Sequence, residues 1–207
     1  MKLKVCGMRD PENLRKLVDQ VNPDFVGFIF HPGSPRYFLD GSEDIPEELP
    51  PEKRTGVFVN NSMEDIVGEA DYFDIRNIQL HGSESPAICN ELMAKGFTVI
   101  KAFGIKSEDD FQKIEDYKEV CDFYLFDTKT NTHGGSGQKF NWQMLDRIKI
   151  SKPYFQSGGI DLDDVNDILN LKQQPYAIDI NSRFEIRPAF KDNEKIKNFK
   201  TQLFNHE

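Results

Sequence analysis

Short apolar segments alternate with helical patterns eight times along this sequence, and this repetition limits the folds open to the chain. We predict strands over residues 2–6, 24–30, 55–59, 75–80, 97–103, 122–127, 153–157 and 176–180. No composition break or linker separates the units, which leaves a closed barrel or a doubly wound open sheet. Even spacing, an eightfold count and the lack of an opening GxGxxG motif favour closure. We therefore predict a single-domain (β/α)8 TIM barrel with short loops over residues 1–207.

Capping signals predict where helices begin. Asp10 suits the N-cap and Pro11 the first position of a helix, so we expect the first helix to start there. Segment 40–53 contains several prolines and has the weakest helical pattern, so we expect a loop or a short helical turn in it. Further start signals are the pairs Ser62 with Asp65, Ser85 with Pro86, and Ser107 with Asp110.

Charge, cysteine content and hydropathy limit the partners. A net charge of -9 and a pI near 5.0 argue against nucleic acid or an anionic membrane as a partner, because no domain-wide basic surface exists to neutralise phosphates. Three cysteines without CxxC spacing fit a reducing cytosol better than a disulfide framework. No export signal and no apolar run of about 18 residues occurs, so we expect a cytoplasmic protein without a membrane span.

Two candidate proton-transfer groups end predicted strands. Cys6 shares one face of the first strand with Lys4, and Asp127 ends the sixth, otherwise apolar strand. The C-terminal ends of parallel barrel strands open on one pocket, so a thiol and a carboxylate there predict an acid/base pair. A free cysteine is more often a buried hydrophobic residue, and an aspartate at this place often caps a helix or braces a loop.

Phosphate-binding signals follow the last two predicted strands. Gly158 and Gly159 come after the seventh strand, and Ser182 and Arg183 after the eighth. Barrels often bind phosphate where these two loops meet, although a Gly-Gly pair alone is usually a tight turn. The glycine-rich run 134–137, after the sixth strand, is typical of a flexible loop that could close over a ligand.

Other polar residues have weaker signals. Arg36 follows the second strand, where a guanidinium could hold a carboxylate, although most single arginines are solvated. His81 is more often a hydrogen-bonded structural histidine than a ligand, and the scattered histidines predict no metal site. Lys4 and Asp179 interrupt apolar strands that are neighbours in a closed barrel, so we predict that they pair inside it.

The motifs together resemble one family, phosphoribosylanthranilate isomerase, over nearly the whole chain and in the family's order. Singly, Cys-Gly and Gly-Gly are weak signals, but collectively these motifs are highly specific. The matching stretches are 4–8, 24–30, 34–37, 56–60, 79–82, 101–103, 126–127, 134–137, 157–160 and 179–182.

This resemblance implies an Amadori rearrangement of N-(5'-phosphoribosyl)anthranilate in tryptophan biosynthesis, without a cofactor. It implies that Asp127, holding a proton through a raised pKa, protonates the ribose ring oxygen, and that Cys6, as thiolate, removes the C2' proton. The expected partner is a small phosphosugar substrate, and the expected state is a monomer or weak homodimer. The predicted substrate-binding residues are Arg36, His81, Gly158, Gly159, Asp179, Ser182 and Arg183.

One departure from the family and three rival functions remain. Arg183 replaces the glycine of the family's Ser-Ser-Gly turn, and we expect its guanidinium to contact the phosphate rather than to crowd it. The rivals are a sister isomerase of histidine biosynthesis, a non-catalytic phosphosugar-binding barrel and a thiol redox protein. An aspartate in place of Cys6 would be expected in the first, and a resolving cysteine in the last.

Overall fold

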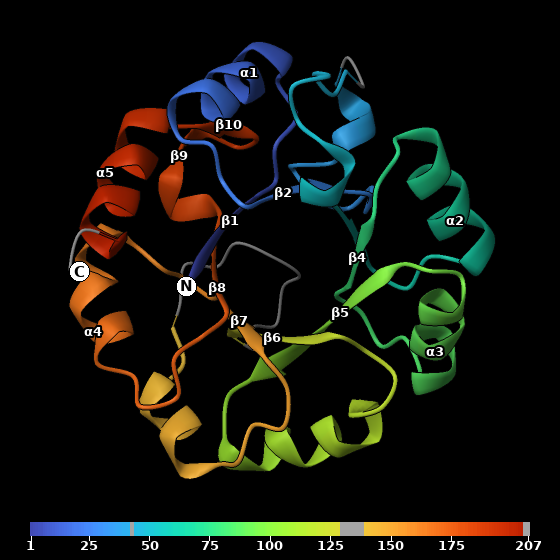
Figure 1. Cartoon of the computed structure of the whole chain (residues 1–207), viewed down its shortest axis with the longest axis vertical. Coiled ribbons are helices and arrows are strands. Elements are labelled where there is room, and N and C mark those ends of the chain that lie inside the picture. The colour runs from blue at the N-terminus through green and yellow to red at the C-terminus, as the bar shows by residue number, and fades with distance from the viewer. Residues whose placement is uncertain (42–43, 129–138, 205–207) are drawn as a thin grey trace.

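Eight parallel strands close into one barrel, as predicted, and helices surround it (Figure 1). The computed structural model describes residues 1–41, 44–128 and 139–204. Closure is made by β8 against β1, where Lys4 lies beside Asp179. The strands are β1 (Lys2–Cys6), β2 (Phe25–Ile29), β3 (Arg54–Phe58), β4 (Asn77–Leu80), β5 (Thr98–Ile105), β6 (Phe123–Thr128), β7 (Tyr154–Gln156) and β8 (Ala177–Ile180).

The α-helices of the outer layer begin near the predicted caps. The Asp10 side chain accepts a hydrogen bond from the Asn13 backbone N–H at 2.9 Å, and Pro11 is the first residue of the first helix. Ser62 caps its helix in the same way, through the Asp65 backbone N–H. The α-helices are α1 (Pro11–Gln20), α2 (Met63–Tyr72), α3 (Pro86–Ala94), α4 (Val165–Leu169) and α5 (Asn193–Phe204).

Several connections contain 3-10 helix where the usual barrel has an α-helix. The proline-rich segment after β2 holds only the short turns η1 (Phe38–Asp40) and η2 (Pro51–Lys53), which confirms the expected weak helix there. Ser107 and Asp110 form the predicted capping box, but the element that they start, η3 (Glu108–Tyr117), is a 3-10 helix. The connection between β6 and β7 likewise contains a 3-10 helix, η4 (Trp142–Arg147).

A small antiparallel hairpin after β8 was not predicted. It consists of β9 (Glu185–Arg187) and β10 (Phe190–Lys191), and Ala189 between them has a positive φ of 64°. The short turn η6 (Ser182–Phe184) connects β8 to the hairpin. Because of this hairpin, the chain passes near the ends of β1 and β2 before α5 begins (Figure 1).

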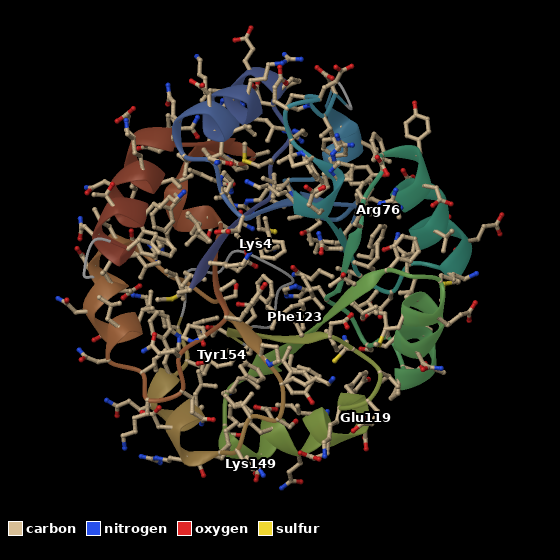
Figure 2. All side chains as sticks on the ribbon, viewed as in Figure 1. Lys4, Arg76, Glu119, Phe123, Lys149 and Tyr154 are labelled. Carbon is tan, nitrogen blue, oxygen red and sulfur yellow. The ribbon has the colours of Figure 1, made fainter. Side chains whose placement is uncertain are left out.

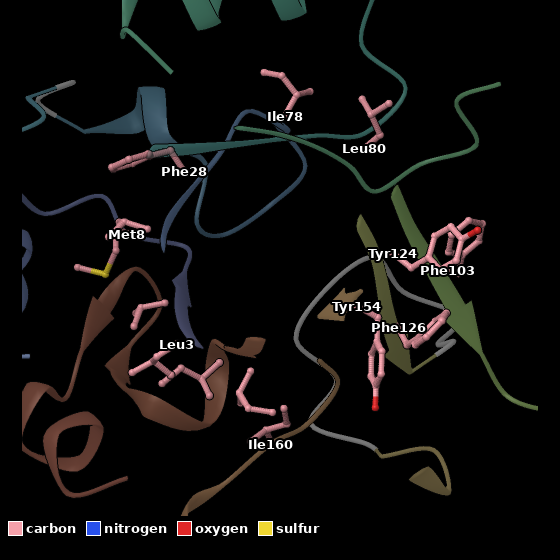
Figure 3. Packing of buried hydrophobic residues seen from close by; sticks show 14 of the residues in the cluster. Leu3, Met8, Phe28, Ile78, Leu80, Phe103, Tyr124, Phe126, Tyr154 and Ile160 are labelled. Carbon is pink, nitrogen blue, oxygen red and sulfur yellow. The ribbon is translucent and has the colours of Figure 1, made fainter. Parts of the chain in front are cut away.

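The buried apolar side chains form two clusters, one between the strands and the helices and one inside the barrel. The larger cluster contains Leu3 and Val5 of β1 and packs between strands and helices (Figure 3). A smaller cluster inside the barrel contains Phe25 and Phe155, whose ring centroids are 5.3 Å apart. Since side chains alternate along a strand, Lys4 and Cys6 face the interior, and Figure 2 shows Lys4 within the ring of strands. The further members of the interior cluster are Ile100, Ala102, Leu125 and Ala177.

Candidate active site

The thiol of Cys6 lies at the C-terminal end of β1, facing the barrel interior and 5 % exposed. Gly27 on β2 is its neighbour in register, and a Cβ at Gly27 would stand 2.8 Å from the Cys6 Sγ. Gly7 follows with a φ of +77°, and a Cβ there would meet the Arg36 side chain at 2.7 Å. Two glycines therefore leave room for the thiol and for the arginine beside it.

Lys4 and Asp179 form the predicted ion pair within the barrel. The Lys4 Nζ donates to both carboxylate oxygens of Asp179 at 3.0 Å, and neither side chain is more than 5 % exposed. Burial disfavours the ammonium, but the charges of Asp179 and Cys6 and the hydrogen bonds to them outweigh it and raise the pKa of Lys4. Lys4 therefore keeps its charge to a higher pH than an ordinary lysine.

The environment of Cys6 favours the thiol at rest. Burial raises the pKa of Cys6, and the nearby Asp179 carboxylate acts in the same direction, while Lys4 and Lys191 oppose the shift without reversing it. Lys4, on the same face of β1, favours a thiolate, but the larger effect of desolvation outweighs it. Further positive charge in the pocket would favour the thiolate.

The carboxylate of Asp127 lies at the end of β6 and is 23 % exposed. Its Oδ1 accepts the Thr128 backbone N–H at 2.7 Å, and its Oδ2 lies 3.2 Å from the Nε2 of His81. Gly158 passes close to it with a φ of +94°, so that an added Cβ would be 3.0 Å from Oδ1 and 2.5 Å from the Thr128 Oγ1. Gly158 is thus needed for close approach to the carboxylate, a role that the sequence reasoning did not assign to it.

His81 follows β4 and lies between two polar side chains. Its Nδ1 is 2.8 Å from the Nε2 of Gln79, and its Nε2 is directed at Asp127. Lys101 holds the turn after β4 by donating to the backbone oxygens of Leu80 and Gly82. The structure therefore places His81 beside the candidate acid, and it adds Gln79 to the site.

Asp179 connects the two candidate proton-transfer groups. Its negative charge acts on the ionisation of Cys6, and the charge of Asp127 acts in turn on that of Asp179. Cys6 and Asp127 lie at the C-terminal ends of β1 and β6, and these ends open on the same side of the closed parallel barrel.

Arg36 is 7 % exposed and is paired with a residue that the sequence reasoning missed. Its Nε and Nη2 donate to the Glu185 carboxylate at 2.6 to 3.0 Å. Lys191 donates to the same carboxylate at 2.6 Å and to the Asn181 Oδ1 at 2.7 Å. The Nη1 of Arg36 has no hydrogen-bond partner among the described residues, so it can still bind a ligand carboxylate. Little in the sequence indicated that Glu185 pairs with Arg36, because Glu185 is a single acidic residue in a hairpin that was not predicted.

Within the group of Glu185, Arg36 and Lys191, the pKa values of Glu185 and Lys191 are both shifted. Burial alone would raise the pKa of Glu185, but the hydrogen bonds and charges of Arg36 and Lys191 outweigh it and lower this pKa. Burial lowers the pKa of Lys191 to about 8, although Glu185 and Cys6 favour its charged form. Glu185 is therefore an anion shared by two buried cations.

The loops after β7 and β8 lie side by side. Gly158 and Gly159 both have positive φ, and Arg183 does not, so an arginine fits the backbone where the family's glycine was expected. Lys195 links the loops by bonding to Asp161 and to the Arg183 backbone oxygen, each at 2.7 Å. The glycine-rich run 134–137 lies outside the described residues.

Neither a metal-binding cluster nor a membrane-spanning helix occurs in the part of the chain that the structure describes. Among the residues that the structure describes, no group of three or more His, Cys, Asp or Glu side chains is arranged to hold a metal ion. Within the same residues, no helix has the length and apolar content needed to cross a membrane.

Comparison with known proteins gives one consistent result. The family model described as N-(5'phosphoribosyl)anthranilate (PRA) isomerase matches residues 3–202. A protein of Phocaeicola vulgatus named N-(5'-phosphoribosyl)anthranilate isomerase is 44% identical over 204 residues, 98% of each chain. The crystal structure of phosphoribosyl anthranilate isomerase from Thermotoga maritima has a TM-score of 0.82 and 34% identity, and 99% of each chain is covered. A structure of such an isomerase in complex with reduced 1-(o-carboxyphenylamino)-1-deoxyribulose 5-phosphate has a TM-score of 0.79 and 30% identity, again over 99% of each chain.

Proposed function

Because this chain belongs to the family of N-(5'-phosphoribosyl)anthranilate isomerases, we propose that it performs their Amadori rearrangement with Asp127 as general acid and Cys6 as general base. The product is 1-(2-carboxyphenylamino)-1-deoxyribulose 5-phosphate, an intermediate of tryptophan biosynthesis. The observation that supports the two roles is the placement of Cys6 and Asp127 at the C-terminal ends of β1 and β6 in one closed parallel barrel. Both groups therefore open on the same pocket, where one small sugar can contact them.

The first step is ring opening. Asp127 donates a proton to the ribose ring oxygen, and the C1'–O bond breaks as the anthranilate nitrogen forms a protonated Schiff base. The acid is poised for this transfer because Thr128 and His81 hold its two oxygens in place. The open-chain sugar then carries a positive charge at its nitrogen.

The second step is proton removal at C2'. The cationic Schiff base favours ionisation of the buried thiol, whose proton passes to solvent, and the Cys6 thiolate then takes the C2' proton. The electron pair of that C–H bond neutralises the iminium nitrogen and gives an enolamine, which tautomerises to the ketone. Electrons move only within the sugar, so the step calls for no cofactor.

The substrate's two anionic ends match the remaining residues. The free Nη1 of Arg36 supports binding of the anthranilate carboxylate, and Glu185 and Lys191 hold the guanidinium in place. The adjacent loops that contain Gly158, Gly159, Ser182 and Arg183 support binding of the 5'-phosphate. We also propose a cytoplasmic location and a monomer or weak homodimer, the latter to be measured by sedimentation.

Turnover of the fluorescent substrate by purified protein tests this proposal. Asp127→Asn should reduce kcat by about 10²–10⁴, because an amide cannot serve as the acid that protonates the ring oxygen, and Cys6→Ser should reduce it strongly. Asp109→Asn removes an exposed carboxylate and Cys89→Ala a buried thiol outside the barrel interior, and both should keep activity. Wild-type protein that leaves the substrate fluorescence unchanged would contradict the function, and full activity of Asp127→Asn would contradict the assignment of the acid.

A further inference from the structure

A chain of hydrogen bonds runs from inside the barrel to the candidate acid. Gln79 of β4 is 1 % exposed, and its Nε2 is 2.8 Å from the Nδ1 of His81. The other ring nitrogen of His81 is 3.2 Å from the Oδ2 of Asp127. Nothing described above assigns Gln79 a role in the reaction, although it is the buried end of this chain.

The proton on His81 decides which form of Asp127 is stabilised. The Oδ1 of Asp127 is occupied by the Thr128 backbone N–H, so the proton of the acid form belongs on Oδ2, which faces His81. A neutral imidazole has one donor and one acceptor nitrogen. With the proton on Nε2, His81 donates to an Asp127 carboxylate; with the proton on Nδ1, the bare Nε2 accepts from an Asp127 carboxylic acid.

The Gln79 amide can support either form. In the structure its NH₂ group faces Nδ1, which places the His81 proton on Nε2 and suits the carboxylate. Its Oε1 is buried and has no hydrogen-bond partner among the described residues. A half-turn of the amide exchanges nitrogen and oxygen, so that Oε1 accepts from Nδ1–H and the acid form is supported. Because Oε1 has no partner in the observed orientation, reversing the amide gives up no hydrogen bond at that end.

We propose that Gln79 is a positioning residue that sets the tautomer of His81 and thereby supports Asp127 in both its protonated and its ionised form. The inference rests on the proposed role of Asp127 as the general acid. An acid must hold a proton before ring opening and remain stable as an anion afterwards. An amide that reverses its orientation meets both needs while His81 stays neutral.

The charged groups of the neighbouring strands pair with one another. Asp179 of β8 is paired with Lys4 of β1 at 3.0 Å. Lys101 of β5 and Glu84 lie behind the turn that carries His81 and pair with each other at 2.9 Å. Neither Lys4 nor Lys101 bonds to Asp127, so His81 is the side chain that contacts its Oδ2 from this side.

Nitrogen-15 NMR of the unliganded wild-type protein tests the tautomer directly. The chain has 4 histidines, which makes assignment of His81 practicable. We expect one protonated ring nitrogen on His81, which changes from Nδ1 to Nε2 as the pH rises through the titration of Asp127. A His81 that is an imidazolium throughout this range, or that keeps the same tautomer across it, would overturn the proposal.

Gln79→Met tests the kinetic consequence. Without the amide, a bare Nδ1 is cheaper to bury than an N–H without a partner, so His81 keeps its proton on Nε2 and favours ionised Asp127. The falling limb of the kcat–pH profile should move to lower pH by about one unit, with kcat on that limb reduced about tenfold and KM nearly unchanged. In the His81→Leu background the same substitution should cause no further shift of the limb.

Gln156→Met is the matched control. Gln156 is also a fully buried strand glutamine whose Oε1 has no partner among the described residues, but its Nε2 bonds to the Ser157 backbone oxygen and not to a histidine. It should lower the melting temperature about as much as Gln79→Met without moving the falling limb. An equal shift in both variants would show that only packing is involved. If Asp127→Asn stayed active, the proposed function would fail, while the NMR result would still decide what Gln79 does to His81.

Discussion

Glu185 accepts hydrogen bonds from the Nε and Nη2 of Arg36, although the two residues are 149 positions apart in the sequence. The pair connects the hairpin after β8 to the loop after β2, so that the guanidinium reaches the barrel mouth already oriented. Lys191 shares the same carboxylate at 2.6 Å. The residue proposed to bind the substrate carboxylate is thus positioned by an acid that the substrate never needs to touch.

We expect Glu185→Gln to weaken substrate binding and folding together. Two buried cations would lose their shared anion, which costs about 3–5 kcal/mol, and the unrestrained Arg36 should raise KM by about tenfold. Denaturant unfolding and steady-state kinetics measure the two effects. Glu108→Gln breaks a glutamate–arginine pair that is about half exposed, and it should cost no more than about 1 kcal/mol. Equal effects of the two substitutions would contradict the positioning role.

Stability should depend on pH through Lys191. Its pKa is about 8 in the folded protein and 10.5 as the ordinary value, so between these pH values the unfolded chain binds more protons. The free energy of unfolding of the wild type, relative to Lys191→Met, should therefore rise by about 3 kcal/mol from pH 8 to pH 10.5, at about 1.4 kcal/mol per pKa unit. Urea titrations across this range measure the difference. The free energy of unfolding of Lys172→Met, a substitution at an exposed position, should change with pH in parallel with that of the wild type. If the free energy of unfolding of Lys191→Met also ran parallel to that of the wild type, the lowered pKa of Lys191 would be contradicted.

Gly158→Ala should affect catalysis, whereas Gly96→Ala should affect only stability. Both glycines have φ near +90°, so an alanine is strained by about 1 kcal/mol at each. Nothing lies within 4 Å of an added Cβ at Gly96, but at Gly158 the Cβ would press on Thr128 and on the Asp127 carboxylate. We expect kcat to fall at least about tenfold in Gly158→Ala alone. Similar kcat values for the two variants would show that the approach to Asp127 does not matter.

Arg183→Gly should raise KM markedly if the guanidinium contacts the phosphate. A lost charge-assisted hydrogen bond of about 1.5–3 kcal/mol corresponds to a rise of roughly tenfold or more, with kcat nearly unchanged. Arg183→Lys keeps the charge and should recover part of the affinity. The backbone alone does not require glycine here, since Arg183 has no positive φ. An unchanged KM in Arg183→Gly would rule out the contact.

The alternation of residues along single strands was enough to predict much of the barrel and one ion pair inside it. Period-two patterning placed Lys4 and Cys6 on the inner face of β1, and neighbouring strands in a closed barrel predicted the pair of Lys4 with Asp179. Local capping chemistry likewise predicted the start of α1 at Asp10. These features depend on interactions between residues close in sequence or in adjacent strands, which a sequence displays directly.

Only the tertiary structure determined which polar groups meet around Cys6 and Asp127. Glu185 reaches Arg36 because a hairpin folds back across the barrel mouth, and Gln79 reaches Asp127 only through His81. The sequence also did not show that burial raises the pKa of Cys6 and favours its thiol form, because desolvation depends on how completely the surrounding chain excludes water. The sequence by itself determined which face each strand side chain occupies, and three-dimensional closure decided the contacts, the burial and hence the ionisation of the groups at the barrel mouth.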